Sequence, residues 1–303
     1  MFARMLNAAW RNPWLLLALC LTFWASNVVA ARLAVGEASP MVLGGMRWLV
    51  SSAIMLPFVW RQIGEYAPMA RQHWLYLLFI SCTGFAFYSC LFYAAGNFTT
   101  GVNISTLVAT VPIFVIVIAW LFLRIPVGPV VVFGVVLTVF GAVTVATRGD
   151  PAVLRNLDFN AGDLMIIAAS VFHASFTVGL RKRPPFPPMV FFTLLAMIAL
   201  VVSLPPVIAE IALGKSFWPT PLGFAILVYV GTFPTILSQS FYMRAVELIG
   251  PHRTTLFYNT VPLLGAAMSV VFLGESFALY HAVAFALVLS GIALAEYWRA
   301  RHG

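Results

Sequence analysis

Residues 102–123 read VNISTLVATVPIFVIVIAWLFL, a run of 22 residues that contains no charged side chain. About 20 consecutive apolar residues are enough to cross the hydrocarbon core of a bilayer as an α-helix. Pro112 stands in the middle of the run, where it removes one backbone donor and frees a carbonyl one turn earlier. The stretch therefore predicts a membrane-spanning helix with a kink.

Runs of the same kind fill almost the whole chain. Of the 303 residues, 62% are apolar and 9% are charged, which is too little polar surface to coat a soluble globule. We therefore expect an all-α membrane protein with ten transmembrane helices and no separate soluble domain. The expected spans are Pro13–Ala34, Pro40–Trp60, His73–Gly96, Val102–Leu123, Pro129–Ala146, Asp163–Leu180, Pro187–Leu213, Pro221–Val246, Thr254–Leu273 and Phe277–Trp298.

The basic residues between the spans are unevenly distributed. The four on one side are Arg32, Arg148, Arg155 and Lys215. The eleven on the side of the N-terminus are Arg4, Arg11, Arg61, Arg71, Arg124, Arg181, Lys182, Arg183, Arg253, Arg299 and Arg301. By the positive-inside rule, we expect both termini to lie in the cytoplasm and the protein to lie in a bacterial-type inner membrane. Because these charges are scattered, we expect the lipid bilayer and a small molecule as partners, and no nucleic acid.

The second half of the sequence repeats the first with a shift of about 150 residues. The matches include Phe23, Ala25 and Ser26 with Phe172, Ala174 and Ser175, and Thr110-Val111-Pro112 with Thr260-Val261-Pro262. Because each repeat has five helices, the second must cross the membrane in the opposite sense. We expect two inverted repeats, residues 1–148 and 149–303, around a site near the membrane midplane.

This pattern resembles EamA-type members of the drug/metabolite transporter superfamily. Arg47 early in the second span, the two Thr-Val-Pro motifs and Leu273-Gly274-Glu275 before the last span carry the resemblance. It implies that spans one to four and six to nine surround a central cavity, with spans five and ten at the periphery. Within the superfamily the chain is most similar to amino-acid and metabolite exporters of the YddG type. It departs from the pattern in the first repeat, which has Arg124-Ile125 where the second repeat has Gly274-Glu275.

Polar side chains at membrane depth are costly, so each needs a partner or a water-filled cavity. We expect Trp24, Asn27 and His173 to face one another across the central cavity; the alternative is that these residues tie helices together. The full set of candidate cavity residues is Trp24, Ser26, Asn27, Tyr88, Tyr93, Asn103, His173, Ser175, Gln239, Tyr242, Tyr258 and Asn259.

Two further features bear on mechanism. Pro112 and Pro262 kink equivalent helices, and such bends can serve as gates. Arg47 lies about 10 Å inside its span at 1.5 Å per residue. It could contact a substrate anion, but the preferred interpretation is that it snorkels outward or pairs with Glu37.

The sequence also limits the chemistry. No Asp or Glu lies near the middle of a span, which leaves facilitated transport, the preferred interpretation, or proton coupling through His173. The alternatives are a carrier for a nucleotide sugar or organic acid, proton-coupled drug efflux, and a scaffold whose polar residues pair off around no cavity. A membrane-embedded enzyme is disfavoured, because no nucleophile with a base, no acidic pair and no metal cluster is visible. We expect no cofactor, no metal and a monomer, with an oligomer as the alternative.

Overall fold

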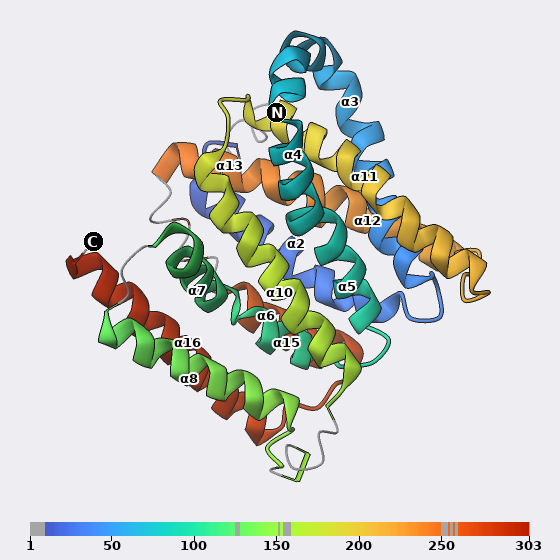
Figure 1. The fold of residues 1–303 in the computed structure, drawn as a ribbon. Helices are drawn as coiled ribbons and strands as arrows, with labels where there is room; N and C mark the ends of the chain where they lie inside the picture. The colour runs from blue at the N-terminus through green and yellow to red at the C-terminus, as the bar shows by residue number, and fades with distance from the viewer. Residues whose placement is uncertain are drawn as a thin grey trace.

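Figure 1 shows a bundle in which every regular element of the described residues is helical. The computed structural model describes residues 10–124, 128–150, 152–153, 159–249, 254, 257 and 260–302. The first half contains α2 (Pro13–Leu33), α3 (Pro40–Gln72), α4 (Trp74–Ser81), η1 (Cys82–Ala86), α5 (Phe87–Ala95), α6 (Gly101–Val108), α7 (Val111–Leu123) and α8 (Pro129–Ala146). The second half contains α10 (Ala161–Gly179), η2 (Leu180–Lys182), α11 (Pro188–Ala212), α12 (Pro221–Thr232), η3 (Phe233–Leu237), α13 (Ser238–Ile249), α15 (Val261–Leu273) and α16 (Leu279–His302).

These helices form the ten expected spans. Eight are long and apolar enough to cross a membrane, and the described parts of the last two spans form shorter apolar helices, Val261–Leu273 and Leu279–Leu294. The all-helical, ten-span prediction is confirmed. Of the basic residues used for topology, Arg4, Arg155 and Arg253 lie outside the described residues.

Helix α3 is longer than the sequence predicted. We expected it to end at Trp60, but it continues to Gln72 and has 33 residues in total. The added part is polar overall, yet Ile63, Tyr66 and Met69 recur at helical spacing and pack against an apolar cluster between α3 and α11. Hydropathy predicts where the apolar run of α3 ends. Packing on α11 stabilises the helix beyond that point.

The two halves share irregular features at the same repeat position. A short π-helical segment interrupts the third span at Cys82–Ala86 and the eighth at Phe233–Leu237. Helices α7 and α15 begin at Val111 and Val261, and both end at a residue in the left-handed conformation, Arg124 and Gly274. Because such irregularities are rare, their recurrence supports a structural repeat.

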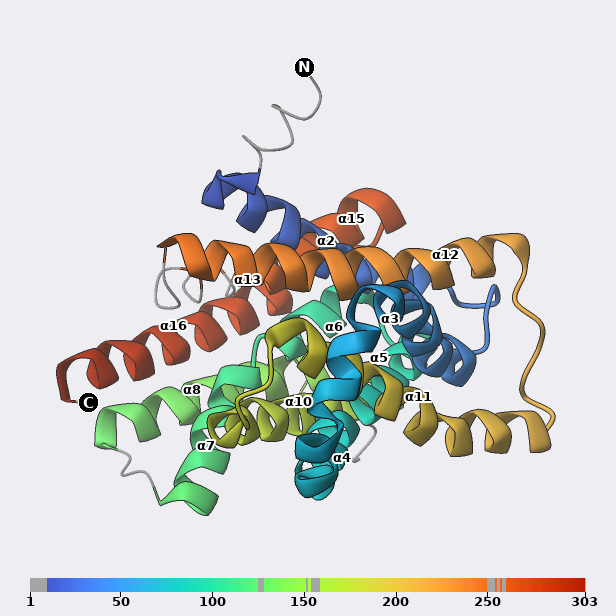
Figure 2. The ribbon, with the colours of Figure 1, turned by 90° about the horizontal axis from the view of Figure 1, so that it is seen from above.

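The packing of the two halves on each other is reciprocal. Helix α2 packs on α13 of the second half, and its counterpart α10 packs on α5 of the first. Ser51 on α3 donates to the Gly231 carbonyl, 2.8 Å away, and Ser81 before η1 donates to the Leu195 carbonyl on α11, 2.7 Å away. Helices α8 and α16 lie side by side at the edge of the bundle in both views (Figures 1 and 2). Spans five and ten are therefore peripheral, as the resemblance implied.

Apolar side chains fill the interior and also cover the outside. One buried cluster joins α2, α5 and α6 to α10 and α12, and a second joins α3 and η1 to α11. Phe58, Phe122 and Val271 are among many large apolar side chains that stay exposed. A surface of this kind is suited to lipid contact, which leaves the buried polar groups as the features that need explanation.

Candidate functional site

A chain of buried polar side chains links the two halves. The Arg47 guanidinium donates through Nη1 to the Tyr93 hydroxyl, 2.8 Å away, and that hydroxyl donates to Asn27 Oδ1 at 2.6 Å. Nη2 donates to the Thr235 hydroxyl, which itself donates to the Val230 carbonyl at 2.6 Å. We call Asn27, Arg47, Tyr93 and Thr235 the Arg47 cluster. It connects α2, α3 and α5 of the first half to η3 of the second.

The charge of Arg47 has no acidic partner in the described part of the chain. The residue is only 6% exposed, and its guanidinium lies 4.8 Å from the Trp48 ring centre and 5.5 Å from that of Tyr93. Its Nε is buried without a hydrogen-bond partner among the described residues. The ion pairs that the structure describes are Arg32–Glu275 and Arg244–Glu247.

The interpretation that the sequence favoured for Arg47 is therefore wrong. The Glu37 carboxylate accepts a hydrogen bond from the Thr220 hydroxyl instead, and the guanidinium points into the protein rather than outward. A buried arginine between aromatic rings, with an unused donor, remains available to an anion that is not part of the described chain.

Other predicted cavity residues of the first span contact the eighth. Trp24 lies against Tyr242 on α13, with ring centres 5.4 Å apart, and the Ser26 hydroxyl is 2.6 Å from that of Tyr229 on α12. Gln239 is half-buried on the same span, and none of the hydrogen bonds found within the described ranges involves its side chain. The first and eighth spans thus bring Trp24 against Tyr242 and Ser26 against Tyr229.

The ring contacts found for His173 are with α5 and with its own helix α10. Its ring contacts Tyr88 on α5 at 5.0 Å between centres, and its Nδ1 is buried with no hydrogen-bond partner in the described residues. Tyr88 stacks on Phe92, whose ring meets that of Tyr93 edge to face. His173 is therefore connected to Asn27 through the side chains of α5, and no direct contact between His173 and Trp24 or Asn27 is found.

The remaining predicted residues have different outcomes. The Ser175 hydroxyl donates to the Val171 carbonyl of its own helix at 2.9 Å, which satisfies it locally. Tyr258 and Asn259 lie outside the described residues.

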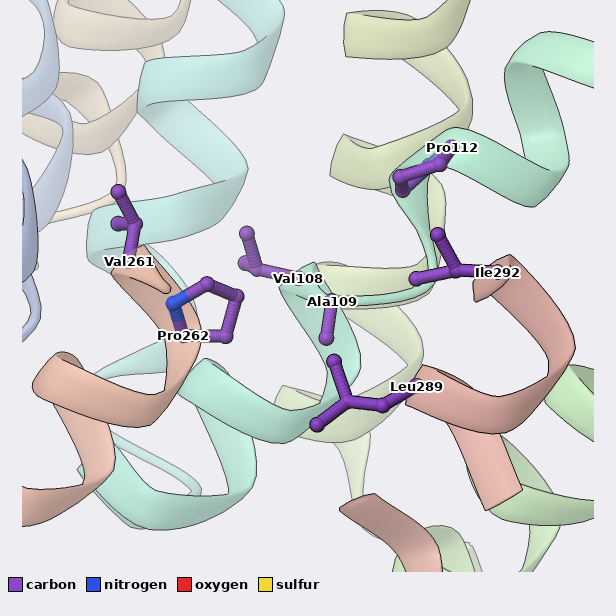
Figure 3. A pocket seen from close by; sticks show the side chains of 7 residues that line it. All are labelled: Val108, Ala109, Pro112, Val261, Pro262, Leu289 and Ile292. Atoms are coloured by element: carbon purple, nitrogen blue, oxygen red, sulfur yellow. The ribbon is translucent and has the colours of Figure 1, made fainter. Parts of the chain in front are cut away.

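The two prolines meet at one small apolar cavity. The cavity has a volume of about 20 Å³ (Figure 3). It is lined by Pro112 and Pro262 together with Val108, Ala109, Val261, Leu289 and Ile292. That volume admits one water molecule and no solute. The helix breaks before Pro112, since α6 ends at Val108 and α7 begins at Val111. The predicted interruption of the fourth span is therefore present, and its counterpart Pro262 lies close by.

A second polar network lies near one end of the bundle. Asp163, at 0% exposure, accepts from the Thr99 hydroxyl at 2.5 Å and from Asn103 Nδ2 at 3.3 Å. His281 Nδ1 accepts from the Ala278 amide, so the neutral ring carries its proton on Nε2 and donates to Asn103 Oδ1 at 2.9 Å. Sequence reasoning proposed Asn103 and missed Asp163 and His281, because both lie at span ends. The available sequence signal was Asn160, which caps the start of α10 and so places Asp163, three residues later, in the first turn of the helix.

Beside this network an ion pair joins the halves. Arg32 Nε is 3.3 Å from Glu275 Oε1, and Arg32 also donates to the Gly96 carbonyl. The Glu275 carboxylate accepts from the amides of Gly101 and Val102, at 2.9 and 3.0 Å, and so caps α6. The glutamate of the Leu-Gly-Glu motif thus holds the start of α6 against the second half.

Repeated halves, a multi-pass helical bundle and a buried polar cluster between the halves are features typical of a membrane transporter. The profile of the EamA-like transporter family matches residues 12–147 and 160–297. The chain therefore belongs to the EamA-like transporter family of the drug/metabolite transporter superfamily. It is a multi-pass membrane transporter and not an enzyme.

Individual relatives are distant but cover nearly the whole chain. The uncharacterized transporter YetK of Bacillus subtilis is 24% identical over 278 residues, covering 91% of this chain and 84% of the relative. An uncharacterized transporter of Archaeoglobus fulgidus is 22% identical over 285 residues, covering 92% and 96%. A protein crystal structure aligns with a TM-score of 0.61 at 18% identity, covering 95% of this chain and 98% of that one. These relatives establish the fold and leave the substrate open.

Proposed function

We propose that this transporter exports amino acids, including aromatic ones, or related small carboxylate metabolites. Transport proceeds by alternating access between residues 1–148 and 149–303, in a bacterial-type inner membrane with both termini in the cytoplasm. The observation that carries the proposal is the buried guanidinium of Arg47, which is bound to both halves and has no acidic partner among the described residues.

The energetic argument rests on charge. A cation held away from water costs several kcal/mol unless a counter-charge and hydrogen bonds compensate it. Tyr93 and Thr235 supply two neutral acceptors, and Arg47 Nε keeps a donor unused. A substrate carboxylate would supply the missing charge and accept from the guanidinium. Because Arg47 reaches both halves, binding there would be sensitive to their relative position.

The surroundings of Arg47 favour a substrate with an apolar or aromatic part. Trp48 and Tyr93 flank the guanidinium, and Trp24 and Tyr242 pair on the adjoining spans. Aromatic walls with a small number of placed polar groups are typical of small-molecule sites. In this proposal Asn27 orients the Tyr93 hydroxyl, Gln239 contacts the polar end of the solute, and Pro112 and Pro262 close the path.

An organic acid without an amino group is the second candidate. The Arg47 cluster contains no carboxylate that could receive a substrate ammonium group. A nucleotide sugar would need more cationic residues than Arg47, and a cationic drug would need an acidic residue in place of it. An amino acid and the organic acid of the same carbon skeleton differ only in the group at the α-carbon, so one assay compares the two candidates.

The test is counterflow in proteoliposomes loaded with an unlabelled amino acid, with labelled amino acids and organic acids outside. We expect labelled aromatic amino acids to accumulate transiently with the purified protein and not with protein-free liposomes. Asn27→Ala and Gln239→Ala should lower the initial rate several-fold while the protein still inserts. If no amino acid or organic acid exchanges above the protein-free level, the proposed function is wrong.

A further inference from the structure

A larger cavity lies away from the Arg47 cluster, at the end of the bundle that the charge distribution assigns to the outside. It has a volume of about 380 Å³ and forms where the end of α2, the link before α6, the end of α8 and the start of α16 meet. Its lining includes Arg32, Asn97, Phe98, Asn103, Arg148 and Tyr280. This volume is within the range of small-molecule sites, and it is larger than the space between the two prolines.

The two arginines of this cavity differ in their partners. Arg32 is paired with Glu275, so its charge is largely satisfied. Arg148 follows α8 in the left-handed conformation, with a φ of 54°, and its side chain is exposed. The Arg148 guanidinium makes no hydrogen bond or ion pair within the described residues, and its charge is opposed only at longer range by the buried Asp163. Arg148 is therefore the cation of this cavity that is placed to receive an anion.

The deep side of the cavity is polar and ordered. Asn103 and Thr99 line it, and both are fixed by Asp163, which is fully buried behind them. The charged groups at and behind the lining are two cations, Arg32 and Arg148, and two anions, Glu275 and Asp163. Their formal charges sum to zero. Tyr280 and His281 add uncharged rings from α16. A balanced lining favours a net-neutral ligand over a multiply charged anion.

The cavity is also connected to the Arg47 cluster through one turn of α5. Asn97, in the lining, donates through Nδ2 to the Tyr93 carbonyl at 3.4 Å and to the Ala94 carbonyl at 3.3 Å. The Tyr93 hydroxyl belongs to the Arg47 cluster. The cavity and the Arg47 cluster therefore lie one helical turn apart along the chain and share a contact with Tyr93.

We propose that this cavity is an outer binding site for a zwitterionic amino acid, with the carboxylate on Arg148 and the side chain against Phe98 and Tyr280. It is the last site that the exported solute occupies, and the proposal rests on the proposed function. Lysine at this position would keep the charge and lose the planar two-donor contact with a carboxylate, so Arg148→Lys should retain only part of the binding.

The test is counterflow with a labelled aromatic amino acid, measured separately from the outer and the inner face of oriented proteoliposomes. Arg148→Gln should raise the half-saturation concentration at the outer face about tenfold, a loss of about 1.4 kcal/mol of binding. The value at the inner face should stay within about twofold, which also shows that the variant folds. Arg148→Lys should lie between the variant and the wild type.

The matched control is Lys215→Gln, which removes an exposed cation from the same predicted face but outside the cavity. This change should alter neither value. If Arg148→Gln leaves the outer value unchanged, raises both values equally, or behaves like Lys215→Gln, the outer site is wrong. If the wild type exchanges organic acids but no amino acid, the outer amino-acid site is wrong; if it exchanges neither from either face, the proposed function itself is wrong.

Discussion

The Arg47 cluster and the region related to it by the repeat occupy equivalent places in the fold but differ in chemistry at three positions. Helix α11 begins with Pro188-Met189-Val190 as α3 begins with Pro40-Met41-Val42, which aligns Leu195 with Arg47. The repeat of α2 in α10 aligns Phe176 with Asn27. The two π-helical segments align Gly84 with Thr235. Three of the four residues of the Arg47 cluster, Asn27, Arg47 and Thr235, thus correspond to two apolar residues and a glycine.

The counterpart region is packed like an ordinary core. Leu195 is buried in the apolar cluster between α3 and α11. The Phe176 ring lies where Gly84 has no side chain, and a Cβ there would collide with it. The repeat thus gives two equivalent buried regions. One contains the Arg47 charge, and the other is packed with apolar side chains. We infer that changes in the first region alter transport and that changes in the second alter stability.

The largest effect is expected when Arg47 is replaced by the residue of its counterpart. Arg47→Leu should lower counterflow at least about 100-fold, because the substrate carboxylate loses the only buried arginine or lysine of the described residues. Thermal stability should stay equal or rise, since an apolar side chain replaces a buried charge. Arg244→Gln, which breaks an exposed ion pair, is the control and should retain transport. Transport within threefold of wild type in Arg47→Leu would remove Arg47 from the site.

A smaller effect is expected from Tyr93→Phe. The change leaves Asn27 Oδ1 and Arg47 Nη1 without partners, which should lower stability by about 1–3 kcal/mol and transport about tenfold. Tyr76→Phe is matched, because the one hydrogen bond found for the Tyr76 hydroxyl within the described residues goes to the Gly179 carbonyl, 3.2 Å away. It should cost about 1 kcal/mol and leave transport unchanged. Thermal unfolding in detergent and counterflow measure the two quantities; equal transport loss in both variants would contradict the comparison.

On the apolar side, Gly84→Ala should destabilise the protein without changing the transport rate per folded molecule. The added methyl group collides with Phe176, so the melting temperature should fall by several degrees, and Phe176→Leu should restore it. Gly64→Ala, in the exposed part of α3 with no atom near the new Cβ, should instead stabilise by about 0.5–1 kcal/mol. A Gly84→Ala protein that is stable but inactive would show that this region also carries function.

The smallest effect is expected at His173. Because glutamine keeps a donor and an acceptor but cannot be protonated, His173→Gln should shift substrate affinity only a few-fold and leave the pH response as it was. An imposed pH gradient should not drive accumulation in either protein, as facilitated transport requires. Uphill accumulation that disappears in His173→Gln would make this a proton-coupled antiporter.

The number of spans, the repeat and the break near Pro112 could be predicted from the sequence, because each depends on local composition or on periodicity. The end of α3 could not, since a polar segment continues the helix only where Ile63 and Tyr66 find an apolar partner. Trp24, Asn27, Tyr93 and Gln239 could be proposed from the cost of polar groups in the membrane alone.

The partners of these residues were beyond sequence reasoning. Arg47 meets Thr235, which is 188 positions away and lies in a π-helical turn with no recognised sequence signal. Glu37 was the nearer carboxylate along the chain, yet it binds Thr220. Nothing in the sequence around His281 indicates its hydrogen bond to Asn103, which lies 178 positions away. Which polar groups meet is decided by the packing of one half on the other.

The most direct test compares two solutes that differ only by a carboxylate. Counterflow of labelled phenylalanine is measured against that of 2-phenylethylamine, in the wild type and in Arg47→Leu. We predict rapid exchange of phenylalanine and not of the amine by the wild type, and no such preference in Arg47→Leu. Equal exchange of the two solutes by the wild type, or an unchanged preference in Arg47→Leu, would contradict a carboxylate site at Arg47.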